Sequence, residues 1–283
     1  MASPRLVAGI APLAATFAVG FAAFAVAACG GHAHPVEVGS HTGGGAGRGP
    51  VMVFIGLSDT SMFEAACHDC DALRAGMVGQ KVSSGKDTFV ITGTVSDGCD
   101  ASGPNDVTGV KRLSGDPDSS PLGVAVLPAG APIDLQTYAT DRVPAGAGAL
   151  RGPLARRATA DLAASGSPVA ADDIVVEQVI DVNVAGDPRP DELIAANVPL
   201  PEDQGPGYRW SALVMAPGGD LEHLVSVWTS DLEHLVIDAS FDLEGDGVRE
   251  LIYSSEYYEG GGRGAATITD GKLTFLGTWG CGA

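Results

Sequence analysis

Basic residues are scarce in this sequence. Its 283 residues include 16 lysines and arginines against 35 aspartates and glutamates, which gives a net charge of −19 at pH 7. Nucleic acids are bound largely through lysine and arginine contacts to phosphate, so a chain of this charge repels them. Nucleic acid is therefore excluded as a partner.

Aromatic side chains and long apolar runs are rare too. Aromatic residues make up 6% of the chain, and one long uncharged run covers residues 6–28. A single run excludes a protein that crosses a bilayer repeatedly with helices. The 40 glycines follow no three-residue period, which excludes a collagen-like chain. The 45% of hydrophobic residues are sufficient to build a globular core.

The apolar run ends in the sequence Val26, Ala27, Ala28, Cys29. This sequence resembles a bacterial lipoprotein signal, in which small residues separate a branched residue from the acylated cysteine. The resemblance implies cleavage before Cys29 and attachment to the membrane through acyl chains. Gly30 at the next position implies the outer membrane in a Gram-negative envelope. An uncleaved anchor helix is the alternative, because a helix over residues 6–28 would be long enough to span a bilayer.

Composition divides the chain into segments. Residues 1–170 hold 14 acidic and 11 basic residues, whereas residues 171–283 hold 21 and 5. The expected segments are a signal peptide (1–28), a glycine-rich tether (29–50), a small β-rich domain with cysteines (51–140), an Ala/Gly-rich connector with a short helix (141–170) and an acidic repeat region (171–283).

Short β-rich runs separated by turn residues predict strands in the first half. These runs are Val51–Leu57, Thr88–Val95, Val107–Leu113 and Gly123–Leu127. A helix is expected over Phe63–Ala75. A second helix is expected to start near Pro153, because Leu154, Ala158 and Leu162 follow at helical spacing and proline suits a first turn.

Four cysteines besides Cys29 are expected in an oxidising compartment. Cys67, Cys70, Cys99 and Cys281 are an even number, so structural disulfides are predicted, with three possible pairings. The Cys67–Cys70 spacing also occurs in redox dithiols and in zinc sites. Both alternatives stay open at the level of sequence.

Acidic residues occupy alternate positions in one loop, at Asp242, Glu244 and Asp246. Gly245 precedes Asp246, and Gly247 follows it. Hard oxygen ligands at this spacing suit calcium if the backbone curls, which glycine permits. The loop resembles the FG-GAP or VCBS repeat, which closes with an acid at its ninth position. The resemblance implies calcium ligands from Asp242, Glu244, Asp246 and Glu250, the Val248 carbonyl, and a strand that begins at Leu251. A solvated acidic turn is the alternative.

A weaker copy of this loop lies earlier in the chain. Its corresponding residues are Asp181, Asn183, Asp187 and Asp191. This loop is longer, and Pro188 occupies the position of Gly247, where proline cannot adopt a positive φ. Calcium is expected here less strongly than at the later loop.

Each copy continues as a strand, a tight turn and a second strand, at Tyr208–Met215 and Ala265–Thr269. The repeated Asp-Leu-Glu-His-Leu-Val sequence at 220–225 and 231–236 fits helix or strand, and its β-branched neighbours favour strand. The expected fold is mainly β, with antiparallel repeats that resemble propeller blades and one or two short helices in the N-terminal half.

Tyr257 and Tyr258 stand among acids before three glycines. Exposed aromatic residues on such loops often bind sugars or peptides, although a tyrosine pair can also pack over a sheet edge. No catalytic residue is identified, because no nucleophile elbow or spaced Ser, His and Asp set is present. The sequence therefore predicts a lipid-anchored envelope protein whose calcium-stabilised β-repeat module has a binding or structural role, with a protein or a carbohydrate as the ligand. An envelope hydrolase with an acidic active site and a thiol redox protein using Cys67 and Cys70 are the alternatives.

Overall fold

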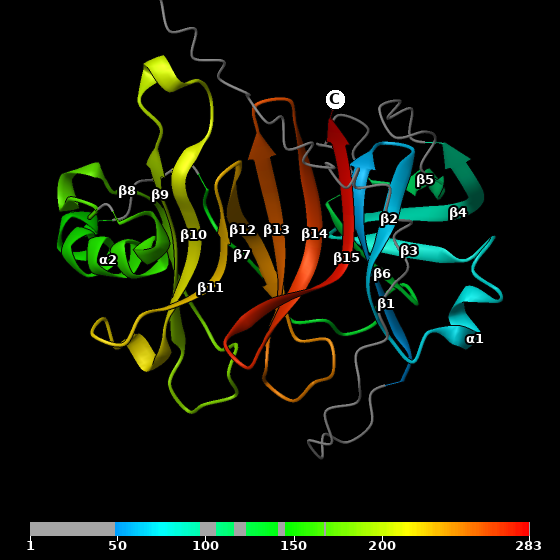
Figure 1. The fold of residues 1–283 in the computed structure, drawn as a ribbon. Coiled ribbons are helices and arrows are strands. Elements are labelled where there is room, and N and C mark those ends of the chain that lie inside the picture. Colours follow the sequence, from blue (N-terminus) through cyan, green and yellow to red (C-terminus); the bar gives the residue numbers. More distant parts are fainter. Residues whose placement is uncertain (1–48, 97–105, 116–122, 141–144, 167, 283) are drawn as a thin grey trace, which may run out of the picture.

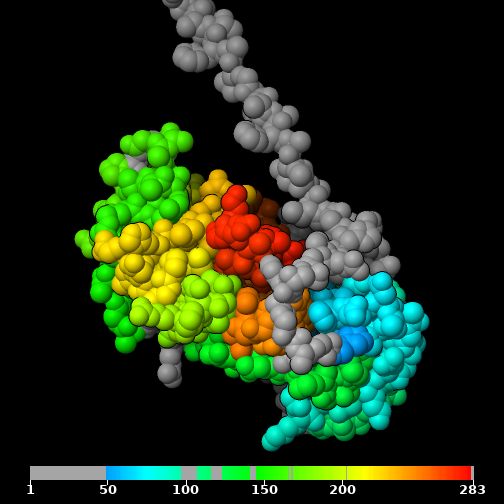
Figure 2. Space-filling model, turned by 90° about the horizontal axis from the view of Figure 1, so that it is seen from below, coloured from blue at the N-terminus to red at the C-terminus, as the bar shows by residue number. Residues whose placement is uncertain are grey.

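The computed structural model describes residues 49–96, 106–115, 123–140, 145–166 and 168–282. Antiparallel strands dominate these residues and form a closed barrel and two open sheets. The units lie in a row, from a helix through the two sheets to the barrel (Figure 1). The space-filling view shows the same order (Figure 2). The expectation of a mainly β, antiparallel fold is confirmed.

The barrel is built from the first half of the chain and closes in the order β1-β2-β5-β4-β3-β6. Its strands are β1 (Val51–Ser58), β2 (Ser61–His68), β3 (Lys81–Ser84), β4 (Asp87–Ser96), β5 (Asp106–Ser114) and β6 (Val124–Leu127). The four runs expected to be strands all lie in it. Met52, Phe54, Phe89 and Leu127 are fully buried in its interior.

The helix expected over Phe63–Ala75 is wrong for most of its length. Residues up to His68 form β2, and the helix α1 (Asp71–Arg74) has four residues. Along β2, Met62 points into the barrel core, whereas Phe63 and Ala65 join a core outside the barrel. Burial on both faces of the strand overrides the helical preference of its alanines.

Two meanders of four antiparallel strands make the open sheets. The first contains β8 (Val175–Val182), β9 (Asp191–Pro199), β10 (Tyr208–Ala216) and β11 (Val225–Ser230). The second contains β12 (Glu233–Phe241), β13 (Glu250–Tyr257), β14 (Gly260–Thr269) and β15 (Lys272–Gly282), with β7 (Leu135–Thr137) added beside β12. β7 thus comes from the segment 51–140 but belongs to the second sheet.

Three apolar layers hold the row of units together. Side chains such as Ile180, Leu213 and Leu251 fill the layer between the two sheets. Phe63 of the barrel packs with Phe241 and Leu276 of the second sheet. The barrel and the second sheet therefore share a core.

The helix α2 (Ala147–Asp161) covers the outer face of the first sheet, through a third layer that includes Leu154 and Trp210. It begins six residues before Pro153, so the expected first-turn position of this proline is wrong. Burial of Ala147 and Leu150 stabilises the earlier start. The Asp161 carboxylate accepts hydrogen bonds from Trp210 Nε1 at 3.0 Å and Ser226 Oγ at 2.6 Å.

Short 3-10 helices lie at Ala163–Ser165, Ala171–Asp173, Glu202–Gln204 and Pro217–Gly219. No helix among the described residues is long and apolar enough to span a bilayer.

The two copies of the Asp-Leu-Glu-His-Leu-Val sequence differ in structure. Most of the second copy lies in β12, as expected, but the first forms a turn before β11, so the expected strand there is wrong. In the turn, Asp220 accepts hydrogen bonds from the Glu222 amide at 3.0 Å and from His223 at 2.8 Å. These local bonds compete with strand pairing.

The Gln178 side chain on β8 hydrogen-bonds to β12 and so links the two sheets. Its side chain is buried, and its Nε2 donates to the Ile237 carbonyl at 2.7 Å while its Oε1 accepts from the Ile237 amide at 2.8 Å. Both strands are irregular at this point, between Val176 and Gln178 on β8 and between Ile237 and Ala239 on β12. The amide side chain thus satisfies the backbone polar groups of Ile237.

Replacing Gln178 with leucine leaves both backbone groups of Ile237 without these partners in a buried place. We expect the Gln178→Leu variant to lose about 3 kcal/mol of unfolding free energy, measured by urea denaturation. Gln204→Leu is the matched control, because Gln204 is exposed. Equal denaturation midpoints for the two variants would contradict the role assigned to Gln178.

Candidate functional site

The two acidic loops occupy equivalent places in the two sheets. The earlier one joins β8 to β9, and the later one joins β12 to β13. The next strand begins at an acid in each sheet, at Asp191 and Glu250. Gly245 and Gly247 adopt φ values of 79° and 86°, which the sequence anticipated for a curled loop. In the earlier loop, Gly186 takes a φ of 76°.

The Asp242 carboxylate organises the later turn. Its oxygens accept hydrogen bonds from the amides of Gly245, Asp246 and Gly247. Asp246 Oδ1 accepts from the Val248 amide at 2.9 Å. The turn is therefore held by carboxylates that bind backbone N–H groups, the arrangement by which aspartate stabilises turns in general.

A buried acid at the start of the following strand accepts hydrogen bonds from each turn. Glu250 Oε2 accepts from the Leu243 amide at 2.8 Å, and Glu250 is 6% exposed. Asp191 is fully buried, and its Oδ2 accepts from the Val184 and Ala185 amides at 3.2 Å each. The two turns thus share one construction, in which the acid at the start of a strand binds amides of the loop before it.

The two turns are also in direct contact. Asn183 Nδ2 donates to the Gly247 carbonyl at 3.1 Å, and the Arg249 amide donates to the Asn183 carbonyl at 2.9 Å. The Arg249 side chain binds Ser240 and Asp134 as well. The turns therefore form a joint between the sheets, and we call them the paired acidic turns (residues 183–190 and 242–249).

The residues expected to bind calcium are brought together only in part. Burial raises the pKa of Glu250 from 4.5 to about 8, and the nearby charges of Asp242 and Asp246 add to the shift. A cation would relieve this crowding. Glu244 turns away, because its Oε1 lies 3.9 Å from Nδ1 of His68 on the barrel.

Among the described residues no group of three or more His, Cys, Asp or Glu side chains is arranged to hold a metal ion. Asp242, Asp246 and Glu250 instead bind the amides of their own turn. In the weaker copy, Asn183 and Asp191 bind backbone groups, while Asp181 and Asp187 are exposed. Calcium at either loop stays a prediction.

Sequence reasoning missed a pair of acids on the first sheet. Asp181 on β8 lies directly opposite Glu192 on β9. Burial and the charge of Asp181 raise the pKa of Glu192, whose Oε1 is buried with no hydrogen-bond partner. The pairing depends on strand register, which only the alternation of neighbouring apolar residues could have indicated.

The cysteines are disulfide-bonded where they are described. Cys67 and Cys70 are joined to each other and are 7% and 3% exposed. Cys281 is likewise in a disulfide. Cys29 and Cys99 lie outside the described residues. Burial of the Cys67–Cys70 bond limits the access of a thiol partner, which thiol exchange requires.

Tyr257 and Tyr258 lie at the turn between β13 and β14. Their rings meet edge to face with centroids 6.4 Å apart. Tyr258 is 59% exposed, whereas Tyr257 is half-buried. His234, on the neighbouring strand β12, shares a 2.7 Å hydrogen bond with the Tyr208 hydroxyl and is not paired with His223.

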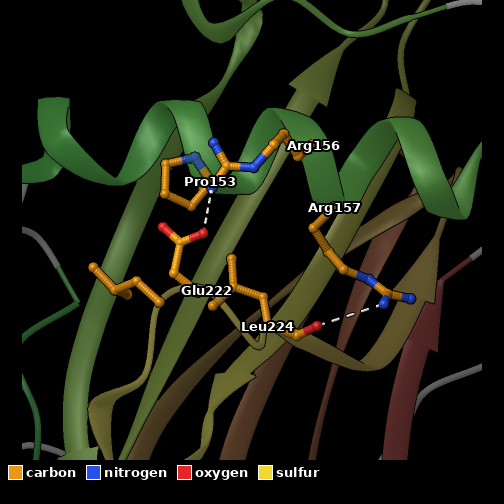
Figure 3. Close-up of a pocket in the computed structure, with 6 residues that line it drawn as sticks. Pro153, Arg156, Arg157, Glu222 and Leu224 are labelled. Atoms are coloured by element: carbon orange, nitrogen blue, oxygen red, sulfur yellow. Dashed lines mark hydrogen bonds and ion pairs between the residues drawn. The ribbon is translucent and has the colours of Figure 1, made fainter.

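Two hollows border the first sheet. A cavity of about 170 Å³ separates α2 from the turn before β11, and Arg156 pairs with Glu222 across it at 3.4 Å (Figure 3). Arg157 donates to the Leu224 carbonyl in the same place. A groove of about 380 Å³ lies between the edge strands β7 and β8, beside Tyr138 and Gln178.

Comparisons with known proteins identify no relative. No family model matches the chain, and no curated protein or solved structure is significantly similar to it.

The raised pKa of Glu250 predicts how stability depends on pH without calcium. A raised pKa in the folded state favours folding at low pH, and this contribution is lost as pH rises from 4.5 through about 8. Glu250→Gln keeps an acceptor for Leu243 and removes the titration. We expect its unfolding free energy, relative to the unaltered chain, to rise between pH 5 and pH 8, with a slope of about 1 kcal/mol per pH unit.

The exposed Glu256→Gln variant is the control, and urea denaturation in EDTA across this pH range is the measurement. A pH-independent difference between Glu250→Gln and the unaltered chain would show that the Glu250 carboxyl is not perturbed.

Proposed function

We propose that this chain is a lipid-anchored protein of the bacterial cell envelope whose folded part is a calcium-stabilised β-repeat module that binds a partner. The lipoprotein-like signal at Val26–Cys29 supports the anchor. Two meanders with the same turn construction support the resemblance to FG-GAP or VCBS repeats. The partner is a protein or a carbohydrate.

The observation that carries this proposal is the contact between the paired acidic turns. Hydrogen bonds join the two turns directly, so a cation held at one turn would stabilise both. Asp242, Asp246 and Glu250 are the side chains that would hold calcium, together with the Val248 carbonyl. Calcium would neutralise their crowded charge, and Glu244 would contribute only after leaving His68.

Calcium is expected to stabilise the folded chain. At 100 times its dissociation constant, a ligand of the folded state adds about 2.7 kcal/mol, which raises the midpoint of thermal unfolding by several degrees. The measurement compares residues 30–283 in EDTA and in excess calcium. The double variant Asp242→Ala, Asp246→Ala should lose this calcium-induced shift.

The shift is compared within each variant, because Asp242→Ala also removes hydrogen bonds to the turn. The matched control is Asp172→Ala, Asp173→Ala, since both of these acids are exposed. An unchanged midpoint for the unaltered chain would mean that the acids stabilise the turn through its amides alone.

Lipidation is expected to depend on Cys29. In a bacterial host supplied with labelled palmitate, the full chain should incorporate the label, and the Cys29→Ser variant should not. Absence of the label from the unaltered chain would instead support an uncleaved anchor helix.

A further inference from the structure

Exposed apolar side chains gather where the β11–β12 and β13–β14 turns meet. Leu232 and Tyr258 are each 59% exposed. Each lies one residue beyond the last pair in the β12–β13 register, Glu233 with Tyr257. The strand ends therefore bring Leu232, Tyr257 and Tyr258 to one place, at the arrowhead of β13 (Figure 1). We call it the Leu232–Tyr258 surface.

The neighbouring strands leave this surface bare. Tyr257 pairs with Gly260 on β14, and Glu256 pairs with Gly261. Gly260 in turn pairs with Gly282 on β15. Because glycine carries no side chain, nothing from these positions covers the tyrosines. Large exposed apolar side chains that are brought together on one surface can mark an interaction site.

Acidic residues flank the residues of this surface along the chain. Asp231, Glu233, Glu256 and Glu259 lie next to its apolar residues in the sequence, and among the described residues none of the four is within 4.0 Å of a lysine or arginine. Glu256 lies 4.0 Å from His234, its one ion-pair partner there. The rim is therefore negative, and it belongs to the half of the chain with the large excess of acids.

We propose that the Leu232–Tyr258 surface docks a basic stretch of polypeptide that carries apolar side chains. Lysine or arginine would pair with the acidic rim and lie against the tyrosine rings, whose faces attract cations. An apolar side chain of the same stretch would cover Leu232. The edge-to-face tyrosines present no common plane on which a sugar ring would stack. The inference rests on the proposed binding function and names the class of partner.

The test uses residues 30–283 and a fluorescent synthetic peptide of alternating lysine and leucine, with binding followed by fluorescence anisotropy. Peptides of lysine with serine and of glutamate with leucine are the matched probes. We expect the lysine–leucine peptide to bind more tightly than either. Leu232→Ser combined with Tyr258→Ser should weaken its binding by about tenfold or more, as for central contacts of an interface.

The rim is tested separately. Glu256→Gln combined with Glu259→Gln should weaken binding and reduce its salt dependence, because rim charges act mainly through screened attraction. The controls change similar residues elsewhere, with Val78→Ser for the apolar pair and Asp172→Asn with Asp173→Asn for the acidic pair. All of these positions are exposed, so the variants should unfold at the same temperature as the unaltered chain.

Equal binding by the surface variants and their controls would overturn the proposal, because attraction to the overall negative charge would then suffice. Equal affinity for the lysine–leucine and lysine–serine peptides would overturn it as well. Neither result would alter the calcium shift or the lipidation of Cys29, so failure of this surface is distinguishable from failure of the proposed function.

Discussion

Burial of apolar side chains between the two meanders is the interaction on which the rest of the structure depends. The layer that contains Ile180, Leu213 and Leu251 fixes the sheets face to face. Their outer faces are then free to pack α2 on one side and the barrel on the other. Where β8 and β12 are irregular, the Gln178 side chain hydrogen-bonds to the amide and the carbonyl of Ile237. The two sheets therefore remain hydrogen-bonded to each other at this point.

The excess of acids is distributed around this layer rather than inside it. Several carboxylates cap backbone amides at the paired acidic turns, where Asp191 and Glu250 are buried. Others stand beside Leu232, Tyr257 and Tyr258 in the sequence. Carboxylates are thus found at both ends of the β12–β13 strand pair. At the paired acidic turns they hold the loops, and at the Leu232–Tyr258 surface we propose that they attract a partner.

Local patterns predicted most of the strands and the curled shape of the later turn. β-branched runs located β1, β4, β5 and β6, and the glycines at 245 and 247 have the positive φ that the loop required. The alanine-rich β2 was missed because its burial on both faces depends on the barrel and the second sheet. The position of Pro153 suggested a later start for α2 than packing produced. The bonds of Gln178 and the adjacency of Leu232 and Tyr258 depend on bulges and register, which no local pattern specifies.

The central claim is that the paired acidic turns act as one unit. Hydrogen exchange of the backbone amides in the Asn183→Ala variant tests it most directly. If the turns are coupled, exchange should accelerate at residues 242–249 as well as at 183–190, because the Asn183 bond to Gly247 is lost. Faster exchange confined to residues 183–190 would contradict the claim.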